Sequence, residues 1–187
     1  VEVVAVASRD RDRARAYASE HDIPRPHGSY EGLLADEDAD AVYVPLPNGL
    51  HHEWTMRALE SGKHVLAEKP YSRHPADVEE AFEAASARRL VLMEAFMYRH
   101  HPQMAIVRDL VARGEIGRLR AIRAAFAFRL EDAGDPRLAP ELDGGALMDV
   151  GCYSVNGSRL LAGEPVRVQG EQIVGETGVD LAFHGTL

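Results

Sequence analysis

Hydrophobic residues in the first half of the chain form short continuous runs, separated by longer stretches with helical spacing. The continuous runs, which predict strands buried on both faces, are Val1–Ala7, Ala41–Val44, His64–Glu68 and Leu90–Ala95. The stretches that predict helices are Arg11–His21, Tyr30–Ala35, His51–Ser61 and Pro75 to about Arg89. Because short connections join strands and helices in alternation, the sequence predicts an α/β fold with a parallel, doubly wound sheet of Rossmann type.

The alternation stops after Ala95, and the second half of the chain mixes the two kinds of pattern. Pro102–Arg113 predicts a helix, and Leu119–Leu130 alternates as an antiparallel strand does. The remaining predicted elements are a helix from about Gly145 to Leu161 and two strand-like runs, Val166–Val174 and Val179–Leu187. We therefore expect an α+β second domain, with one domain over residues 1–97 and the other over residues 98–187.

Composition narrows the class of partner. The chain of 187 residues is 45% hydrophobic, with a formal net charge of -9 and a pI near 5.4. It has no dense run of Lys and Arg, which argues against nucleic acid or an anionic membrane and favours a small-molecule ligand. A single cysteine, Cys152, excludes an internal disulfide framework and fits a reducing compartment. No apolar run is long enough to cross a bilayer, so we expect a cytoplasmic protein.

A glycine-rich turn of the form GxGxxG, which holds the pyrophosphate of a dinucleotide after the first strand of such a sheet, is absent. The chain begins at Val1 directly on a strand-like run and stops within another, so we expect it to be a fragment. On this interpretation Val1–Ala7 is the second strand of the sheet. The absence of the turn fits equally a protein that binds no dinucleotide.

The run Val65–Pro70 combines a buried strand with charged residues at its end. Ligands of open parallel sheets lie outside the carboxyl ends of the strands, so Glu68 and Lys69 are expected to face a crevice. The alternative is that Lys69 points into solvent beside Glu68, because Lys and Glu are mostly exposed.

Ser8 and Arg9 end the first predicted strand. An acidic residue at this place accepts a hydrogen bond from the ribose of NAD, whereas an Arg accommodates the extra phosphate of NADP. The pair therefore favours NADP, although Asp10 lies next to it and Arg9 would equally suit the start of a surface helix.

Asn48, His51 and His52 follow the next strand, in a loop that opens a helix. A helix N-terminus favours acceptors and anions. We predict that Asn48 contacts a cofactor and that one of the two histidines faces the substrate. Adjacent histidines without further ligands at metal spacing predict no metal site.

Asp149 and Tyr153 are four residues apart on a predicted helix, so they share one of its faces. With an amine opposite them, a carboxylate and a phenol form an acid/base set in which the amine favours the phenolate. The alternative is an Asp that stabilises its helix N-terminus and a Tyr in the core. Near the domain junction, Arg99 would hold a phosphate or a carboxamide, or else form a hinge salt bridge.

In chain order, these residues resemble the Gfo/Idh/MocA oxidoreductases, which include glucose-fructose oxidoreductase, inositol dehydrogenase and the dimeric dihydrodiol dehydrogenases. The matching stretches are Val4–Asp10, Tyr43–His51, His64–Pro70, Met93–Pro102 and Gly144–Tyr153. The combination of Glu68-Lys69-Pro70 with the Asp149-x-Gly-x-Tyr153 pattern is the specific part. The family has a Rossmann domain for NAD(P) and a second domain with a largely antiparallel open sheet that often forms subunit contacts.

The resemblance implies a role for each matching residue. Lys69 corresponds to the family's catalytic lysine, and Asp149 and Tyr153 to the residues that bind and deprotonate the reacting hydroxyl. The cofactor-contacting positions are Ser8, Arg9, Pro45, Asn48, Glu68 and Arg99, to which we add His51 and Lys69. The Lys69–Pro70 bond resembles one that is often cis in the family. Many members have His in place of Tyr153, and a glycine in place of Asp143.

The sequence as a whole predicts an NADP-preferring or NAD-dependent oxidoreductase acting on a hydroxyl-bearing carbon of a sugar, cyclitol or related diol. We expect a homo-oligomer, a dimer or a tetramer, without nucleic acid or membrane partners. One alternative is a non-catalytic NAD(P)-binding sensor or regulatory protein of the same fold. Another is a reductase of this fold that acts on an imine or a tetrapyrrole.

Overall fold

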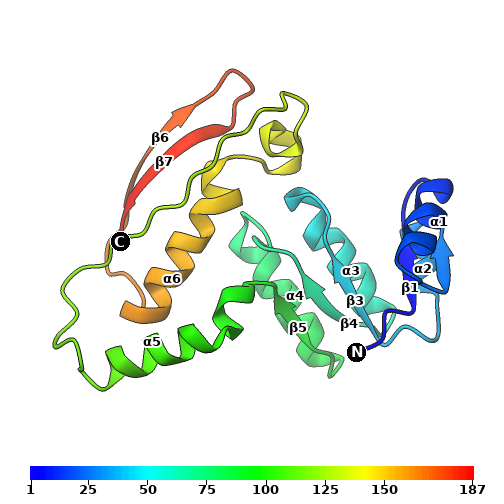
Figure 1. Cartoon of the computed structure of the whole chain (residues 1–187), viewed down its shortest axis with the longest axis horizontal. Coiled ribbons are helices and arrows are strands. Elements are labelled where there is room, and N and C mark those ends of the chain that lie inside the picture. Colours follow the sequence, from blue (N-terminus) through cyan, green and yellow to red (C-terminus); the bar gives the residue numbers. More distant parts are fainter. The chain divides into compact units, whose positions relative to one another are not determined.

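A computed structural model describes all 187 residues, and the contacts within it divide the chain into two compact units. The first unit comprises Val1–Pro45, His52–Ala67 and Pro75–Met93, and the second comprises Leu46–His51, Glu68–His74 and Glu94–Leu187. Two short segments that follow strands of the first unit, Leu46–His51 and Glu68–His74, therefore belong to the second unit. Figure 1 labels the elements along the chain.

The first unit contains short parallel strands and four helices. Its strands are β1 (Ala5–Ala7), β2 (Arg25–His27), β3 (Ala41–Val44), β4 (His64–Ala67) and β5 (Leu92–Glu94), the last of which ends in the second unit. Its helices are α1 (Arg11–Glu20), α2 (Tyr30–Leu34), α3 (His51–Glu60) and α4 (Pro75–Ala87), of which α3 begins on a residue of the second unit. Strand β1 pairs in parallel with β2, and β3 pairs in parallel with β4 within a sheet of order β3-β4-β5.

The core of this unit lies where the strands meet α3 and α4. Val65 of β4 and Val44 of β3 are 3% and 4% exposed, and Leu59 of α3 is fully buried. The predicted parallel sheet with its alternating helices is thus confirmed. Asp10 is the N-cap of α1, where its Oδ1 accepts hydrogen bonds from the backbone N–H groups of Asp12 and Arg13 at 2.9 and 3.0 Å. Gly62, two residues after the end of α3, adopts a left-handed conformation with φ of 76°.

Two predictions about the first strands were wrong. The expected strand Val1–Ala7 is reduced to Ala5–Ala7, because its partner β2 offers only three residues to pair with. Strand β2 itself was missed, because the segment around Pro24 and Pro26 contains no hydrophobic run. A proline is tolerated in β2 because the strand pairs with β1 alone and is an edge strand.

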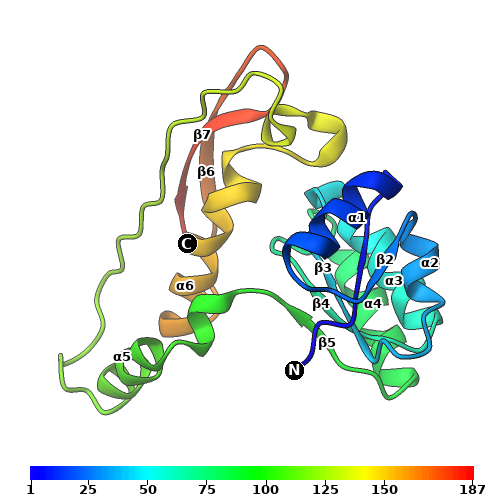
Figure 2. The same ribbon diagram turned by 45° about the vertical axis from the view of Figure 1, so that its right-hand side comes forward.

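The second unit contains helices α5 (Pro102–Ala112) and α6 (Cys152–Ala162) and the antiparallel hairpin of β6 (Gln169–Val174) and β7 (Asp180–Thr186). Figures 1 and 2 both show α6 running beside this hairpin. Short 3₁₀ turns lie at Asn48–Leu50, Met97–His100, Pro136–Leu138 and Pro140–Leu142. No helix in either unit combines the length and the hydropathy that a membrane span requires.

The predicted strand Leu119–Leu130 is absent, and Figure 2 shows this segment as an extended tube. Its alternation is real, but β6 and β7 pair only with each other. An extended segment becomes a strand only when another strand supplies partners for its N–H and C=O groups. The second unit therefore has an antiparallel sheet, as predicted, but one of two strands only.

The predicted helix from Gly145 to Leu161 begins as a π-helix over Leu147–Gly151 and continues as α6. Gly145, at φ of 119°, precedes it, and a side chain there would collide with the carboxylate of Asp180. That carboxylate accepts a hydrogen bond from the N–H of Leu147 at 2.7 Å and so satisfies one of the helix's first donors. The π-helix carries Asp149, and such irregular turns are frequent at functional sites.

Candidate active site

Lys69 occupies the end of a buried strand, as the sequence predicted, and its side chain does not point freely into solvent. Its ammonium group donates hydrogen bonds to the backbone carbonyl of Asp149 at 2.6 Å and to the Oδ1 atom of that residue at 3.1 Å. Both side chains are largely buried, 14% exposed for Lys69 and 13% for Asp149. The Lys69–Pro70 peptide bond is cis, as the resemblance implied.

Tyr153 completes the cluster that the sequence predicted. The Lys69 Nζ atom lies 5.2 Å from the centroid of the Tyr153 ring, over its face. Phe96 and Phe126 each pack against the ring with centroids 5.5 Å apart. Lys69, Asp149 and Tyr153 all belong to the second unit, which brings the amine of Lys69 to a carboxylate and a phenol that follow it by 80 or more residues.

The electrostatic effect on the phenol differs from our expectation. We predicted that the amine would favour the phenolate, yet the pKa of Tyr153 is raised, first by burial and then by electrostatic interaction with Cys152, Glu68 and Asp149. The charge of Lys69 is paired with that of Asp149, and its ammonium group lies over the face of the Tyr153 ring. Tyr153 therefore holds its proton at neutral pH, and its hydroxyl lies 3.7 Å from the sulfur of Met97.

Arg137 is a part of this cluster that the sequence did not predict. Its Nε atom donates to the second carboxylate oxygen of Asp149 at 2.9 Å, and its Nη1 contacts Asp135 at 3.1 Å. Burial works to lower the pKa of Arg137, but the carboxylates of Asp149 and Asp135 outweigh it and the net shift is upward. Asp149 is thus held between two cations, with one oxygen on each.

Cys152 lies between the two acid/base candidates on the chain, but its thiol takes no part in the set. Burial, the largest cause, raises the pKa of Cys152 to about 11, and the charges of Glu94 and Asp149 add to this effect against that of Lys69. The thiol therefore stays protonated and unreactive at neutral pH.

Asn48 lies in the turn after β3, and its side-chain amide donates to the backbone carbonyl of Asp143 at 2.9 Å. Asp143 adopts a left-handed conformation, φ 55° and ψ 43°, at the position where the family has a glycine. Its carboxylate pairs with Arg73 at 3.2 Å. The amide oxygen of Asn48 remains as the group that the residue would offer to a cofactor.

His51 lies in a different environment from the one that the sequence indicated. Its side chain is fully buried, and its two ring nitrogens contact the backbone carbonyls of Pro70 and Leu46. The structure therefore offers no ring nitrogen of His51 to a cofactor or a substrate.

Glu68 and Arg99, the other predicted cofactor contacts in the second unit, have separate settings. The carboxylate of Glu68 accepts a hydrogen bond from the N–H of Lys69 at 3.1 Å. Arg99 is exposed, and its charge acts on Glu94, whose pKa is raised by burial and lowered in part by the N–H of Tyr71 and by the charges of His51, Arg99 and Arg159.

The first unit carries the remaining predicted cofactor residues: Ser8, Arg9 and Pro45. Ser8 is buried directly after β1, whereas Arg9 and Pro45 are exposed. The Ser8 hydroxyl accepts a hydrogen bond from Nε of Arg13 at 3.0 Å, which places a second guanidinium group at this strand end. We did not predict Arg13 as a cofactor contact. The sequence does place it five residues after Ser8, in the first turn of α1, where its side chain can reach the end of β1.

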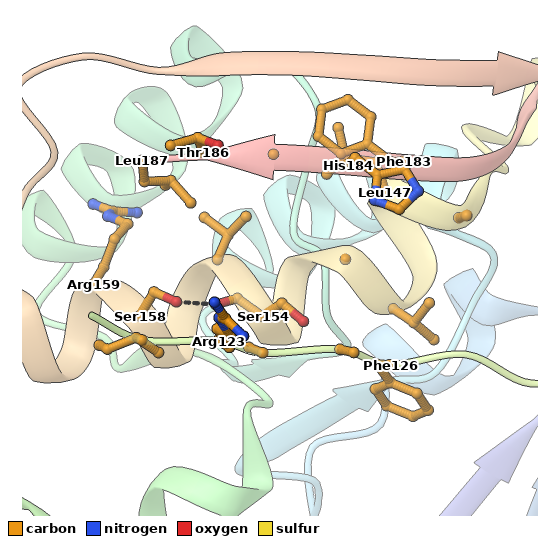
Figure 3. A pocket seen from close by; sticks show the side chains of 18 of the residues that line it. Arg123, Phe126, Leu147, Ser154, Ser158, Arg159, Phe183, His184, Thr186 and Leu187 are labelled. Atoms are coloured by element: carbon orange, nitrogen blue, oxygen red, sulfur yellow. Dashed lines mark hydrogen bonds between the residues drawn. The ribbon is translucent and has the colours of Figure 1, made fainter.

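No group of three or more His, Cys, Asp or Glu side chains is arranged to hold a metal ion. The second unit has a broad open hollow of about 1610 Å³ beside α6. Figure 3 shows Arg123 and Phe126 of the extended segment below α6, and above it Phe183, His184 and Thr186 of β7 with Leu187, which follows the strand. Asp149 and Arg137 reach this hollow, but Lys69 and Tyr153 do not line it, so the hollow is not the acid/base site.

Comparison with known proteins places these observations in a family. Residues 1–96 match the model of the oxidoreductase family with an NAD-binding Rossmann fold, GFO/IDH/MocA, and residues 104–187 match the model of a GFO/IDH/MocA C-terminal domain. Among curated proteins, the chain is 46% identical to D-xylose 1-dehydrogenase (NADP(+)) 2 of Haloferax volcanii, over 100% of this chain and 58% of the relative.

Two further similarities come from actinobacterial enzymes. The chain is 46% identical to the dTDP-3,4-didehydro-2,6-dideoxy-alpha-D-glucose 3-reductase of Streptomyces violaceoruber, over 96% of this chain and 53% of the relative. It is 39% identical, with a TM-score of 0.88, to a crystal structure of a 3-ketoreductase from Actinomadura kijaniata with NADP and TDP-benzene, over 97% of this chain and 56% of that one. The chain therefore spans little more than half the length of these relatives. Both domain matches and these identities show that the chain belongs to the Gfo/Idh/MocA oxidoreductase family.

Proposed function

We propose that this protein is an NADP-preferring oxidoreductase that moves hydride between C4 of the nicotinamide and a hydroxyl-bearing carbon of a sugar, cyclitol or related diol. The observation that carries the proposal is the convergence of Lys69, Asp149 and Tyr153, with Lys69 Nζ 3.1 Å from the Asp149 carboxylate and over the Tyr153 ring. If the Lys69–Asp149 ion pair served only to stabilise the fold, it would not need the phenol of Tyr153 next to it. An amine, a carboxylate and a phenol together supply the groups that exchange a proton with a hydroxyl or a carbonyl.

Each residue has a distinct task in this scheme. Tyr153 Oη exchanges the proton with the substrate oxygen, and its raised pKa suits it to donate that proton when a carbonyl is reduced. The Lys69 ammonium hydrogen-bonds the substrate oxygen or supports the phenol as the proton moves. Asp149, fixed by Lys69 and Arg137, orients Lys69 and accepts hydrogen bonds from neighbouring substrate hydroxyls. Bound cofactor supplies the redox chemistry, and the protein supplies position and electrostatics.

The donor set after β1 fits the additional phosphate of NADP. Two guanidinium groups, from Arg9 and Arg13, and the Ser8 hydroxyl lie at this strand end. The neighbouring carboxylate of Asp10 caps α1, where its Oδ1 accepts the N–H groups of Asp12 and Arg13. Asn48, Glu68, Arg99 and Pro45 would contribute the other cofactor contacts.

The relatives agree with this class of reaction. They are a D-xylose 1-dehydrogenase that uses NADP and a 3-reductase of a didehydro-dideoxyglucose nucleotide. The 3-ketoreductase of Actinomadura kijaniata was also solved as a variant with a lysine changed to alanine and as one with a tyrosine changed to phenylalanine. We further propose the domain division at residues 97 and 98, a homo-oligomeric state and a cytoplasmic location, the last because a single cysteine suits a reducing compartment.

The test is turnover of NADP-dependent oxidation across a panel of sugars and polyols by the intact protein and its variants. We expect Lys69→Ala to lower turnover by about a hundred- to ten-thousand-fold while NADP still binds. Arg113→Ala is the matched control, because that cation is 61% exposed at the end of α5 and contacts only Asp109. Unchanged turnover in Lys69→Ala would remove Lys69 from the mechanism. Tight NADP binding without turnover on any substrate would favour the non-catalytic sensor instead.

A further inference from the structure

The imidazole of His51 is fully buried between two loops of the second unit, Leu46–His51 and Glu68–His74. Its Nδ1 atom lies 2.9 Å from the carbonyl oxygen of Pro70, and its Nε2 atom lies 2.6 Å from the carbonyl oxygen of Leu46. Both distances are in the range of hydrogen bonds. The ring thus joins the loop that carries Asn48 to the residue directly after Lys69.

The chemistry of these contacts fixes the charge of the ring. A backbone carbonyl oxygen only accepts hydrogen bonds, so each ring nitrogen must donate. A neutral imidazole carries a single N–H, which would leave the lone pair of the other nitrogen facing a carbonyl oxygen at 2.6 or 2.9 Å. Only the doubly protonated ring makes both contacts attractive.

We propose that His51 is a buried imidazolium that ties the Leu46 carbonyl to the Pro70 carbonyl and thereby positions Lys69. It is a positioning residue and touches neither substrate nor cofactor. The link holds the two loops at a fixed separation, so the Lys69 amine is presented from a backbone that is fastened one residue away. The unsatisfied carbonyls that a missing ring would leave are each costly to bury.

A buried cation needs a compensating charge, and the structure provides one. The charge of His51 acts on Glu94, whose Oε1 accepts the N–H of Tyr71 at 2.8 Å, one residue beyond Pro70. Arg99 and Arg159 are the other cations that act on this carboxyl. On the second loop, the Glu68 carboxylate is bound to the Lys69 N–H, the Lys69 ammonium is paired with Asp149, and Arg73 is paired with Asp143. His74, the last residue of that loop, is exposed. Glu94 is therefore the counter-ion that we assign to His51.

A loss of the second proton would break one of the two hydrogen bonds. The link between the two loops is therefore complete only while both ring nitrogens carry a proton. Its effect on turnover rests on the proposed oxidoreductase function, whereas the charge of the ring does not.

The direct test is long-range ¹H–¹⁵N NMR of the protein labelled with ¹⁵N-histidine, at neutral pH. We expect the two ring nitrogens of His51 to have closely similar shifts and both to carry protons that exchange slowly, which is the signature of an imidazolium. One bare and one protonated nitrogen, with widely separated shifts, would overturn the proposal. The signal is assigned by its loss in His51→Gln or, if that variant does not fold, by through-bond correlation to the backbone of the native protein.

Kinetics supply the second readout. We expect His51→Gln to lower kcat by roughly ten- to a hundredfold, as expected when a reacting group shifts by about 1 Å, with the affinity for NADP little changed. His21→Gln is the control, because that ring is exposed at the end of α1 and stacks only on Tyr17. An imidazolium signal with unchanged kcat in His51→Gln would contradict the positioning role. A neutral ring in a fully active protein would contradict the charge assignment alone and leave the proposed function standing.

Discussion

Strand β4 and the segment Leu119–Leu130 have sequence patterns that predict a strand, yet only β4 is one. β4 lies between β3 and β5, and its Val65 and Ala67 are 3% and 0% exposed. The segment Leu119–Leu130 has no hydrogen-bonded neighbour, and its Phe126 and Phe128 are 51% and 52% exposed. Hydrophobic pattern determines which side chains can share a face, but partners elsewhere in the chain determine whether the strand forms.

The largest expected difference between these regions is in stability. Leu59→Ala removes a fully buried side chain of α3 and should lower the free energy of unfolding by about 2 to 5 kcal/mol. Phe128→Ala removes a half-exposed ring and should change it by less than about 0.5 kcal/mol. Urea unfolding of the 187-residue chain, followed by far-UV circular dichroism, measures both. A loss of several kcal/mol in Phe128→Ala would show that the extended segment is packed in solution and would break the comparison.

The same contrast explains which parts of the fold were predictable. Strands β3 and β4 and helices α1, α3 and α4 follow local periodicity and caps such as Asp10, so their bounds were close. Strand β2 was missed because its pairing with β1 is not visible in the Pro-rich segment around Pro26. The π-helix at Leu147–Gly151 was missed, and the Leu147 N–H at its start is bound by Asp180, 33 residues further along the chain, a contact that no local pattern indicates.

The candidate site divides in the same way. Lys69, Asp149 and Tyr153 were chosen from strand-end position, helical spacing and family resemblance, and the structure brings all three together. Arg137 lies in the 3₁₀ turn Pro136–Leu138, in a segment without periodicity or motif, so nothing local indicated its bond to Asp149. The direction of the Tyr153 pKa was wrong because burial, the largest cause, is a property of tertiary packing. Local patterns identified the chemical groups but not their surroundings.

Arg137 gives the next largest effect and tests whether a contact unseen in the sequence matters to the site. We expect Arg137→Ala to lower kcat/KM by about tenfold. This is less than the loss expected for a fully buried charged hydrogen bond, because the Arg137 side chain is 50% exposed and solvent weakens its interaction with Asp149. Arg137→Lys should recover part of the loss, since a single ammonium group can still reach Asp149. Arg129→Ala is the control, with its side chain 88% exposed and paired only with Glu131. Equal rates in Arg137→Ala and Arg129→Ala would show that Lys69 alone holds Asp149.

Asp36 tests the paired region of the first unit through its response to acid. Hydrogen bonds from His27, the largest cause, and from Arg25 lower the pKa of Asp36 from 3.8 to about 2. Because the folded pKa is depressed, the stabilisation is present above about pH 4 and is lost as the pH falls toward 2. Asp36→Asn should therefore be less stable than the native chain at pH 7, and the difference should shrink across this window. A constant difference from pH 7 to pH 2, measured by thermal unfolding, would contradict the assignment.

The smallest effect is expected at Asp143, where two costs oppose each other. Asp143→Gly removes the strain of a non-glycine residue in the left-handed conformation, which is about 1 kcal/mol. It also removes the ion pair with Arg73, whose side chain is 54% exposed. In addition, glycine increases the conformational entropy of the unfolded chain, which destabilises the fold. The backbone carbonyl that binds Asn48 stays in place. We therefore expect the free energy of unfolding to change by less than about 1 kcal/mol. Arg73→Ala removes the ion pair without altering the turn, so a variant Asp143→Gly that is more stable than Arg73→Ala would assign the difference to backbone strain. If Arg73→Ala were instead the more stable variant, the Asp143 carboxylate would stabilise the fold by more than the left-handed backbone conformation costs.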